Sequence, residues 1–266
     1  MKSLLPTVET GKGARKRFGQ HFLVDPAVLD EIVACLDSPE TGPLVEIGPG
    51  RGALTERLLA RGFTLNAVEI DRDLIAHLGH RFSKASGLTL HEGDALHFDF
   101  TALSPPAQAL RLVGNLPYNI STPLLFRLLE LGSRVREMCF MLQKEVAARM
   151  VAVPGTADYG RLAVMTQAFC DVGVAFDVPP EAFAPPPRVD SSVVLLRPHT
   201  RRTCRFSDLS TLVAEAFLHR RKMLRQTLAR RFPAGTLESL GIAATDRPEN
   251  ISVDQYVALA GLVTAP

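Results

Sequence analysis

Short apolar segments alternate with amphipathic segments through the first two thirds of the chain. Apolar residues at helical spacing follow several of the segments, and an order of strand, helix and strand at this spacing is typical of a parallel sheet covered by helices. The pattern predicts strands at residues 44–47, 65–70, 88–91, 110–113 and 138–142, and helices at 54–61, from 122, from 144 and at 161–170. Asp25 and Pro26, followed by a helical apolar stripe, predict a further helix before the first strand.

The pattern changes near residue 200. Two more predicted strands, 172–178 and 191–196, flank a loop at residues 179–189 that holds five of the nineteen prolines. Because prolines stiffen the loop and cannot pair in a sheet, we expect this strand pair to include one antiparallel member. Beyond His199 the chain predicts only helices, at 209–218, 223–231 and 253–263. We therefore expect an α/β domain at residues 1–200 and a small helical domain at 201–266.

A glycine-rich loop is the first candidate for ligand binding. The sequence VEIGPGRG at residues 45–52 runs from a predicted strand into a predicted helix. Glycines let a ligand lie against the backbone, and the helix N-terminus offers free amides. Gly48, Gly50 and Ala53 also match a dinucleotide-binding pattern, with Glu69 at the position of a ribose-binding acid. An NAD-dependent oxidoreductase is therefore a rival interpretation.

Glu46 argues against a dinucleotide. Its carboxylate is expected near the place that a pyrophosphate would occupy, and two anions in a partly dry cleft repel each other. S-adenosylmethionine carries an ammonium, a carboxylate and a sulfonium but no phosphate, so a carboxylate beside the loop favours it. Glu69 can accept hydrogen bonds from both ribose hydroxyls, and Asp94, after the third strand, can accept one from the adenine amine. The alternative is that Glu46 and Asp94 cap helices or pair with arginines.

A second motif, GNLPY at residues 114–118, follows the fourth predicted strand. It is therefore expected at the carboxyl ends of the strands, where open parallel sheets bind ligands. The amino group of adenine is a poor nucleophile, and acceptors aimed at its protons direct its lone pair at a methyl donor. The Asn115 oxygen and the Leu116 carbonyl are candidates, with Pro117 stiffening the turn and Tyr118 stacking on a flipped base. The alternative is an ordinary turn rich in turn-forming residues.

Composition sets limits on the class of protein. With 266 residues, 46% of them hydrophobic, the chain can bury a sizeable core. Its four cysteines show no paired spacing, which is typical of reduced residues in the cytosol. No secretory signal and no apolar segment of about 18 residues is evident, so we expect a cytoplasmic protein without a membrane partner. His77 and His80 share a predicted helix face but lack a third ligand, so no metal is expected.

The net charge of +2 conceals two basic clusters. Residues 197–231 hold ten Lys or Arg and two acidic residues, and a second cluster lies at residues 12–17. Concentrated positive charge suits a phosphate backbone, although solvated basic faces give the same pattern. We expect RNA contacts from Arg220, Arg221, Lys222 and Arg225, on one predicted helical stretch with Arg230 and Arg231.

Taken in order, these motifs resemble those of the ribosomal RNA adenine N6-dimethyltransferase family, most of all its bacterial small-subunit (16S) branch. The likeness spans nearly the whole chain. The matching stretches are KRFGQHFL at 16–23, the loop at 45–52, EID at 69–71, GD at 93–94, NLPY at 115–118, MLQKE at 141–145, YGRL at 159–162, residues 183–191, HRRK at 219–222 and NIS at 250–252. Arg51 departs from the family, which often has a smaller or apolar residue there.

The resemblance implies a Rossmann-like, S-adenosylmethionine-dependent methyltransferase sheet with a small C-terminal helical domain. Such enzymes dimethylate two adjacent adenines in the 3'-terminal hairpin of small-subunit rRNA, late in assembly of the 30S subunit, and we expect a monomer. By the same likeness, Phe183 packs on the target base opposite Tyr118. The likeness also assigns cofactor contacts to His21, Leu23, Gly48, Glu69, Asp94 and Asn115. Glu46 and Gly50 join these cofactor-binding candidates on the loop pattern described above.

Two further rivals lie within this resemblance. One is a non-catalytic RNA-binding or transcription-assisting protein that keeps the fold, and the intact NLPY motif argues against it. The other is a methyltransferase that acts on the large-subunit (23S) rRNA and confers resistance. The basic C-terminal helices and the loop at residues 183–191 favour the small-subunit branch by resemblance.

Overall fold

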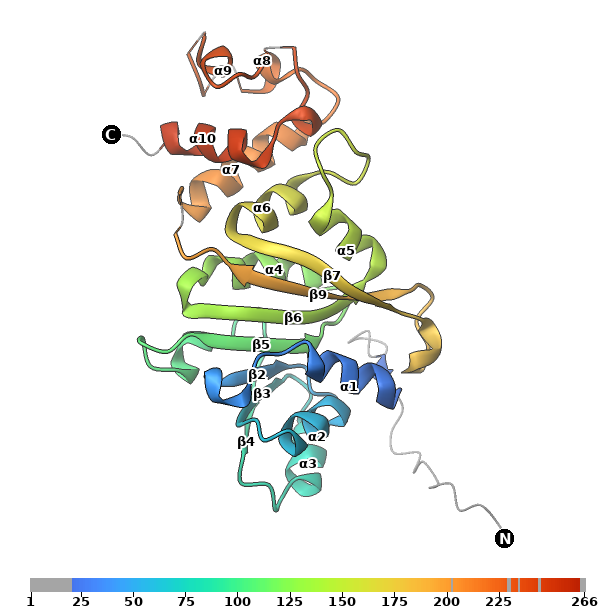
Figure 1. Ribbon diagram of the computed structural model, residues 1–266. Helices are drawn as coiled ribbons and strands as arrows, with labels where there is room; N and C mark the ends of the chain where they lie inside the picture. Colours follow the sequence, from blue (N-terminus) through green and yellow to red (C-terminus); the bar gives the residue numbers. More distant parts are fainter. Residues whose placement is uncertain (1–20, 202, 229–230, 234, 244, 264–266) are drawn as a thin grey trace.

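A seven-stranded sheet forms the centre of the protein (Figure 1). The computed structural model describes residues 21–201, 203–228, 231–233, 235–243 and 245–263. The strand order is β4-β3-β2-β5-β6-β9-β7, with the first five of these parallel and β9 antiparallel to both of its neighbours. The strands are β2 (Leu44–Ile47), β3 (Leu65–Glu69), β4 (Leu88–Glu92), β5 (Leu110–Asn115), β6 (Val135–Gln143), β7 (Cys170–Val178) and β9 (Ser191–Pro198). The predicted strands and the single antiparallel member are confirmed.

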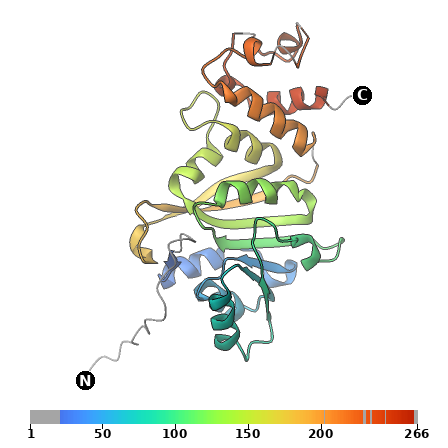
Figure 2. The same ribbon diagram turned by 180° about the vertical axis from the view of Figure 1, so that it is seen from behind.

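Helices cover both faces of this sheet (Figures 1 and 2). They are α1 (Pro26–Ala34), α2 (Ala53–Ala60), α3 (Arg72–Arg81), α4 (Ser121–Glu130), α5 (Lys144–Val151) and α6 (Arg161–Phe169). Asp25 begins α1 as predicted, because its carboxylate accepts from the backbone N–H groups of Ala27 and Val28. Short 3₁₀ turns lie at Pro39–Thr41, Phe100–Leu103, Gly132–Arg134, Pro180–Ala182 and Pro248–Asn250.

Alternate residues of the central strands enter two separate cores. Leu112 of β5 packs in a cluster with α4, α5 and α6, and the next residue, Val113, packs in a cluster with α1 and α2. This alternation follows from the two-residue period of a strand, and both faces are apolar because both are covered. The strand-and-helix pattern of the sequence thus yields a Rossmann-like α/β fold, as expected.

The last part of the chain is helical, with α7 (Phe206–Leu218), α8 (Leu224–Thr227), α9 (Thr236–Ser239) and α10 (Val253–Val263). The predicted helix at residues 223–231 is wrong in its extent: Leu228 leaves the helical conformation at φ −107° and ψ 2°, while residues 229–230 lie outside the described part. Leu209 of α7 and Tyr256 of α10 are buried in the same hydrophobic cluster as Leu162 of α6. The domain boundary near residue 200 stays a prediction.

A second, two-stranded sheet lies apart from the first. In it, β1 (Phe22–Leu23) pairs antiparallel with β8 (Phe183–Ala184), which belongs to the proline-rich loop. Val24 adds a backbone hydrogen bond to the carbonyl of Ala182. The sequence pattern did not predict this pair, because two-residue strands have no detectable period. It joins the beginning of the described chain to the loop between β7 and β9.

None of the helices in the described part of the chain combines the length and the apolar character that crossing a lipid bilayer requires. The four cysteines are free thiols, Cys139 and Cys170 fully buried and the other two partly buried.

Candidate functional site

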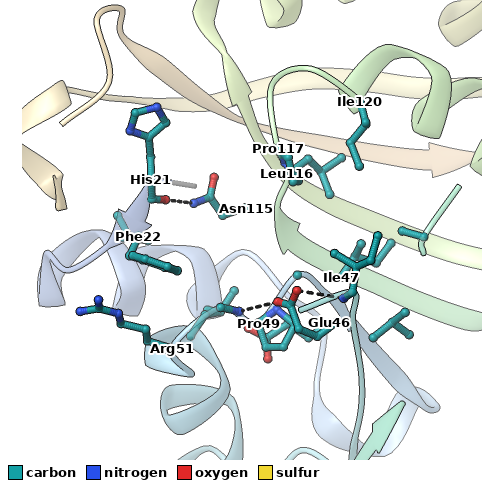
Figure 3. A pocket seen from close by; sticks show the side chains of 18 of the residues that line it. His21, Phe22, Glu46, Ile47, Pro49, Arg51, Asn115, Leu116, Pro117 and Ile120 are labelled. Carbon is teal, nitrogen blue, oxygen red and sulfur yellow. Dashed lines mark hydrogen bonds between the residues drawn. The ribbon is translucent and has the colours of Figure 1, made fainter. Parts of the chain in front are cut away.

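A cavity of about 220 Å³ lies where β2, β3 and β5 end (Figure 3). Its wall is contributed by the glycine loop, the ends of β3 and β4, the turn after β5 and the segment containing β1. The lining residues are 21–23, Ile32, 46–51, 53–54, 68–70, 93–96 and 115–120. The carboxyl ends of parallel strands meet at one edge of a sheet, which explains why motifs far apart in sequence converge here.

The glycine loop brings bare backbone to the cavity. Gly48 has φ +69° and Gly50 has φ +57°, a region that L-residues with a side chain seldom adopt. The ring of Phe22 lies over Gly50 so closely that a Cβ built there would be 3.0 Å from it. The Arg51 guanidinium packs over the same Phe22 ring, 4.7 Å from its centroid. The loop is thus covered by β1 at Gly50, where a side chain would meet the Phe22 ring.

Glu69, the last residue of β3, has a carboxylate held by backbone amides. One oxygen accepts from the N–H groups of Ile70 at 2.9 Å and Asp71 at 3.0 Å, and the other accepts from Gly50 at 3.2 Å. Burial nevertheless raises the pKa of this carboxyl above its usual value. The result is a fixed hydrogen-bond acceptor at the cavity wall, and the bond to Gly50 couples it to the glycine loop.

Glu46 lies deeper, with 2% of its surface exposed. Its carboxylate accepts a hydrogen bond of 2.6 Å from the Thr55 hydroxyl, and burial raises its pKa to about 7. The sequence pattern predicted a carboxylate that faces a cationic ligand. The structure shows a carboxyl that lines the cavity and is also tied to α2. A cation beside it would favour the charged form.

Asp94 lines the cavity on the side of β4. One carboxylate oxygen accepts from the Leu96 N–H at 2.9 Å and the other lies 3.0 Å from Nδ1 of His97. The bond from Leu96 is the main reason why the pKa of Asp94 lies below its usual value. Asp94 therefore both caps a turn and presents a charged acceptor to the cavity, so the two interpretations offered by the sequence are compatible.

Asn115 stands at the end of β5, facing the segment before β1 (Figure 3). Its Nδ2 donates to the backbone carbonyl of His21 at 2.9 Å. Because a carbonyl is only an acceptor, this contact assigns the amide orientation: nitrogen toward His21 and oxygen away from it. The neighbouring Leu116 is buried, and its N–H donates to Met141 on β6. The motif is thus fixed to the sheet on one side and to the N-terminal segment on the other.

Tyr118 is half-buried and held at two places. Its hydroxyl lies 2.7 Å from Oγ of Ser191, the first residue of β9. Its ring stacks on the His21 ring, with centroids 5.7 Å apart and planes at 26°. Nδ1 of His21 lies 2.9 Å from the carbonyl of Pro185 in the proline-rich loop. Burial raises the pKa of the Tyr118 phenol, which therefore stays neutral.

Phe183 lies in the core and does not line the cavity, and its contact with a target base stays a prediction. Its side chain is 3% exposed and packs in the core cluster that includes Leu23 and α1. It is absent from the residues lining the cavity. The reason is the pairing of β8 with β1, in which Phe183 stands opposite Leu23. In this conformation a contact between Phe183 and a target base would require the ring to leave that core.

Sequence reasoning missed several contributors. Thr55, Pro185 and Ser191 hold Glu46, His21 and Tyr118 respectively. Thr55 lay within reach of a sequence argument, since a residue on the first turn of the helix after the loop faces back toward the strand. Pro185 and Ser191 gave no such signal, because they are distant in sequence from their partners.

The four basic residues expected to contact RNA differ in their surroundings. Arg221, Lys222 and Arg225 are exposed. The Arg220 guanidinium instead pairs with Glu249 at 2.9 Å and donates to the carbonyls of Thr156 and Ala157. The basic cluster at residues 12–17 lies outside the described residues. Within the described part of the chain, no three His, Cys, Asp or Glu side chains are arranged to hold a metal ion.

Comparisons with known proteins give one consistent result. A family model described as ribosomal RNA adenine dimethylase matches residues 11–264. Proteins named ribosomal RNA small subunit methyltransferase A are similar over most of both chains. The one from Pseudomonas putida is 48% identical over 250 residues, covering 93% of this chain and 94% of that protein. The one from Alcanivorax borkumensis is 51% identical over 255 residues, covering 95% and 91%.

Solved structures agree on the fold. A dimethyladenosine transferase from Plasmodium falciparum superposes with a TM-score of 0.76 at 27% identity, covering 90% of this chain and 96% of that one. The 23S rRNA methyltransferase ErmE superposes with a TM-score of 0.70 at 24% identity, covering 92% and 100%, which bears on the fold alone. By its sequence motifs, its fold and these matches, the chain belongs to the ribosomal RNA adenine dimethylase family.

Proposed function

We propose that this protein transfers methyl groups from S-adenosylmethionine to N6 of two adjacent adenosines in the 3'-terminal hairpin of small-subunit (16S) rRNA. The observation that carries the proposal is the Asn115 amide, fixed by His21 at the end of β5 within a cavity that Glu69 also lines. The names of relatives 48 to 51% identical to the chain support the small subunit over the large one.

S-adenosylmethionine, the methyl donor of this family, fits the residues that are present. When bound, it supplies an electrophilic methyl group on a sulfonium sulfur. The backbone of Gly48 and Gly50 accepts close approach, and Glu69 offers fixed acceptors for ribose hydroxyls. Asp94 offers an acceptor for the adenine amine, while the segment with His21 and Leu23 covers the site. The buried Glu46 carboxyl beside the loop would repel a pyrophosphate, which disfavours NAD.

The residues after β5 act on the acceptor adenine. With Nδ2 of Asn115 committed to His21, the Oδ1 atom and the Leu116 carbonyl are the acceptors for the two protons on N6. Pro117 restricts the turn, and the Tyr118 ring offers a stacking surface to a base that has left its helix. These residues supply alignment and electrostatics, and the scheme needs no strong general base.

The rest of the chain positions the RNA. We infer that residues 201–266 grip the rRNA with the exposed Arg221, Lys222 and Arg225, beside the methyltransferase part at 1–200. Arg220 would join them only by exchanging Glu249 for a phosphate. The proposed setting is the cytoplasm, where a monomer acts on the assembling 30S subunit.

The test is substitution of Asn115. We expect Asn115→Ala to lower methyl transfer to small-subunit particles that lack dimethyladenosine by at least about 100-fold. Calorimetry should show that the variant still binds S-adenosylmethionine and that neither protein binds NAD. Asn66→Ala is the matched control, since Asn66 bonds to His91 outside the cavity. Methyl incorporation by Asn115→Ala equal to that of the wild type would overturn the proposal.

The position of the product is tested separately. Primer extension on rRNA from treated particles should stop at two adjacent adenosines in the 3'-terminal hairpin. Stops in large-subunit rRNA instead would favour the resistance-type alternative.

A further inference from the structure

The proposed function requires the Tyr118 ring to be held in a fixed orientation. It lies in the turn that follows β5, is only half-buried and lines the cavity, where the His21 ring stacks on it with centroids 5.7 Å apart. A tyrosine side chain rotates about two torsions, and a surface that stacks on a base must hold both. Stacking on His21 restrains one face of the ring, and a hydrogen bond at the hydroxyl restrains its far end.

Ser191 makes that contact from a rigid position. Its hydroxyl lies 2.7 Å from the Tyr118 hydroxyl, and the residue is fully buried. As the first residue of β9 it stands opposite Gln143 of β6 and Val178 of β7. The carbonyl of the preceding residue, Asp190, accepts from the N–H of Lys144 at the start of α5. Two neighbouring strands and a helix terminus therefore hold the Ser191 backbone in place.

We propose that Ser191 is a positioning residue for methyl transfer, which fixes the plane of the Tyr118 ring through the hydrogen bond between the two hydroxyls. The inference rests on the proposed function, since it assumes that Tyr118 stacks on the acceptor base. Ser191 touches neither the donor nor the acceptor and acts only through Tyr118. It sets the angle at which the base is presented, whereas Asn115 binds the reacting amine.

Ser192 provides a matched comparison one residue away. It is also buried, at 1% exposure, and its hydroxyl also makes a hydrogen bond of 2.7 Å. Its partner is Asp177 on β7, whose other oxygen pairs with Lys144. Successive residues of a strand face opposite sides of the sheet, so the Ser192 hydroxyl points away from Tyr118. Each serine-to-alanine change removes one buried hydroxyl from the same strand, but only the change at Ser191 removes a hydrogen bond to Tyr118.

The experiment is a double-mutant cycle on methylation of small-subunit particles that lack dimethyladenosine. Ser191→Ala should lower kcat by about 5- to 100-fold. The lower value corresponds to the loss of one neutral hydrogen bond, and the upper value to a reactant held out of alignment. The KM for S-adenosylmethionine should stay unchanged, because the donor site is not touched. Tyr118→Phe, which keeps the ring and loses the hydroxyl, should show the same loss. In the Tyr118→Phe background, Ser191→Ala should have no further effect. Ser192→Ala should stay within about twofold of the wild type.

Three outcomes would overturn the inference: wild-type kcat in Tyr118→Phe, an equal loss from Ser191→Ala in both backgrounds, or an equal loss in Ser192→Ala. Tyr118→Phe tests the hydroxyl contact even if Ser191→Ala does not fold. Absence of methylation by the wild-type protein would instead refute the proposed function, so the two failures are distinguishable.

Discussion

The two sides of the cavity are held together by contacts of different reach along the chain. On the donor wall, defined as the glycine loop with Glu46 and Glu69, the hydrogen bonds that these two carboxylates accept join residues at most 19 positions apart. On the acceptor wall, defined as residues 115–118 with His21 and Ser191, the contacts span 94, 73 and 164 positions. One strand-helix-strand unit therefore builds the donor wall, whereas the acceptor wall exists only in the complete fold.

This difference predicts how substitutions separate. A change on the donor wall should weaken donor binding and leave the geometry of transfer intact. A change on the acceptor wall should leave donor binding intact and slow transfer. A change where β2 and β5 touch should damage both walls, because these strands carry the glycine loop and Asn115 respectively.

The largest effect is expected from Gly114→Ala, at that junction. A Cβ on Gly114 would lie 2.4 Å from the backbone carbonyl oxygen of Ile47, and backbone in a paired strand cannot move aside cheaply. We expect a loss of about 3 kcal/mol in the free energy of unfolding, measured by urea denaturation, together with loss of donor binding and of methylation.

Gly173→Ala is the control for that experiment. Gly173 also lies within a strand, and a Cβ there would meet no atom within 4 Å. Its free energy of unfolding should be equal to or above that of the wild type, since alanine loses less backbone entropy on folding. If the two alanine variants were equally stable, the close approach of β2 and β5 would not be a constraint on the site.

An intermediate effect is expected from Glu69→Gln on the donor wall. The glutamine N–H₂ group would face a backbone N–H group, so that at least one hydrogen bond to the side chain is lost. The site would also lose a charged acceptor for the ribose. We expect the affinity for S-adenosylmethionine, measured by calorimetry, to fall about 10- to 100-fold. The rate of methyl transfer at saturating donor should stay close to that of the wild type.

Glu92→Gln is the matched control for Glu69→Gln. Glu92 ends the neighbouring strand β4 and pairs with Arg72 on the surface. Its loss should leave donor affinity unchanged, because exposed ion pairs contribute little. A fall in kcat at saturating donor for Glu69→Gln would show that the two walls are not separable.

The smallest effect is expected from His21→Ala on the acceptor wall. The substitution removes the stacking on Tyr118 and the contact with Pro185, but it keeps the backbone carbonyl that orients Asn115. We expect kcat to fall about 5- to 10-fold with little change in donor affinity. His80→Ala, on the exposed face of α3, should match the wild type in both. A loss of donor affinity larger than the loss of kcat would assign His21 to the donor wall.

The donor wall could be predicted from the sequence because its information is local. A strand, a glycine turn and a helix follow one another directly, and Glu69 comes at the end of the next strand. The turn at residues 115–118 could be placed at the same edge because it also follows a strand. The succession of strands and helices along the chain from β2 to β6 could be predicted from the strand and helix periods of the apolar residues alone.

What the sequence pattern could not predict depended on contacts between distant segments. An aromatic residue in a proline-rich loop, such as Phe183, is equally compatible with a base contact and with the core, and its partner strand lies at the other end of the domain. Residues 223–231 have helical spacing, but the backbone N–H of Leu224 bonds to Asp246, and the helix ends at Thr227. Arg220 is expected to contact RNA, and its ion pair with Glu249, 29 residues later, is not visible in the sequence. No local pattern contains this information.

The pairing of β1 with β8 also bears on the order in which the protein is completed during translation. Phe22 and Leu23 leave the ribosome early. Their pairing partners, Ala184 and Phe183 respectively, are synthesised about 160 residues later. At roughly 10 residues per second, the early strand waits on the order of 15 seconds for its partner. The β1 cover over the candidate site therefore forms only after most of the sheet has been translated, and a nascent chain released before residue 184 would lack it.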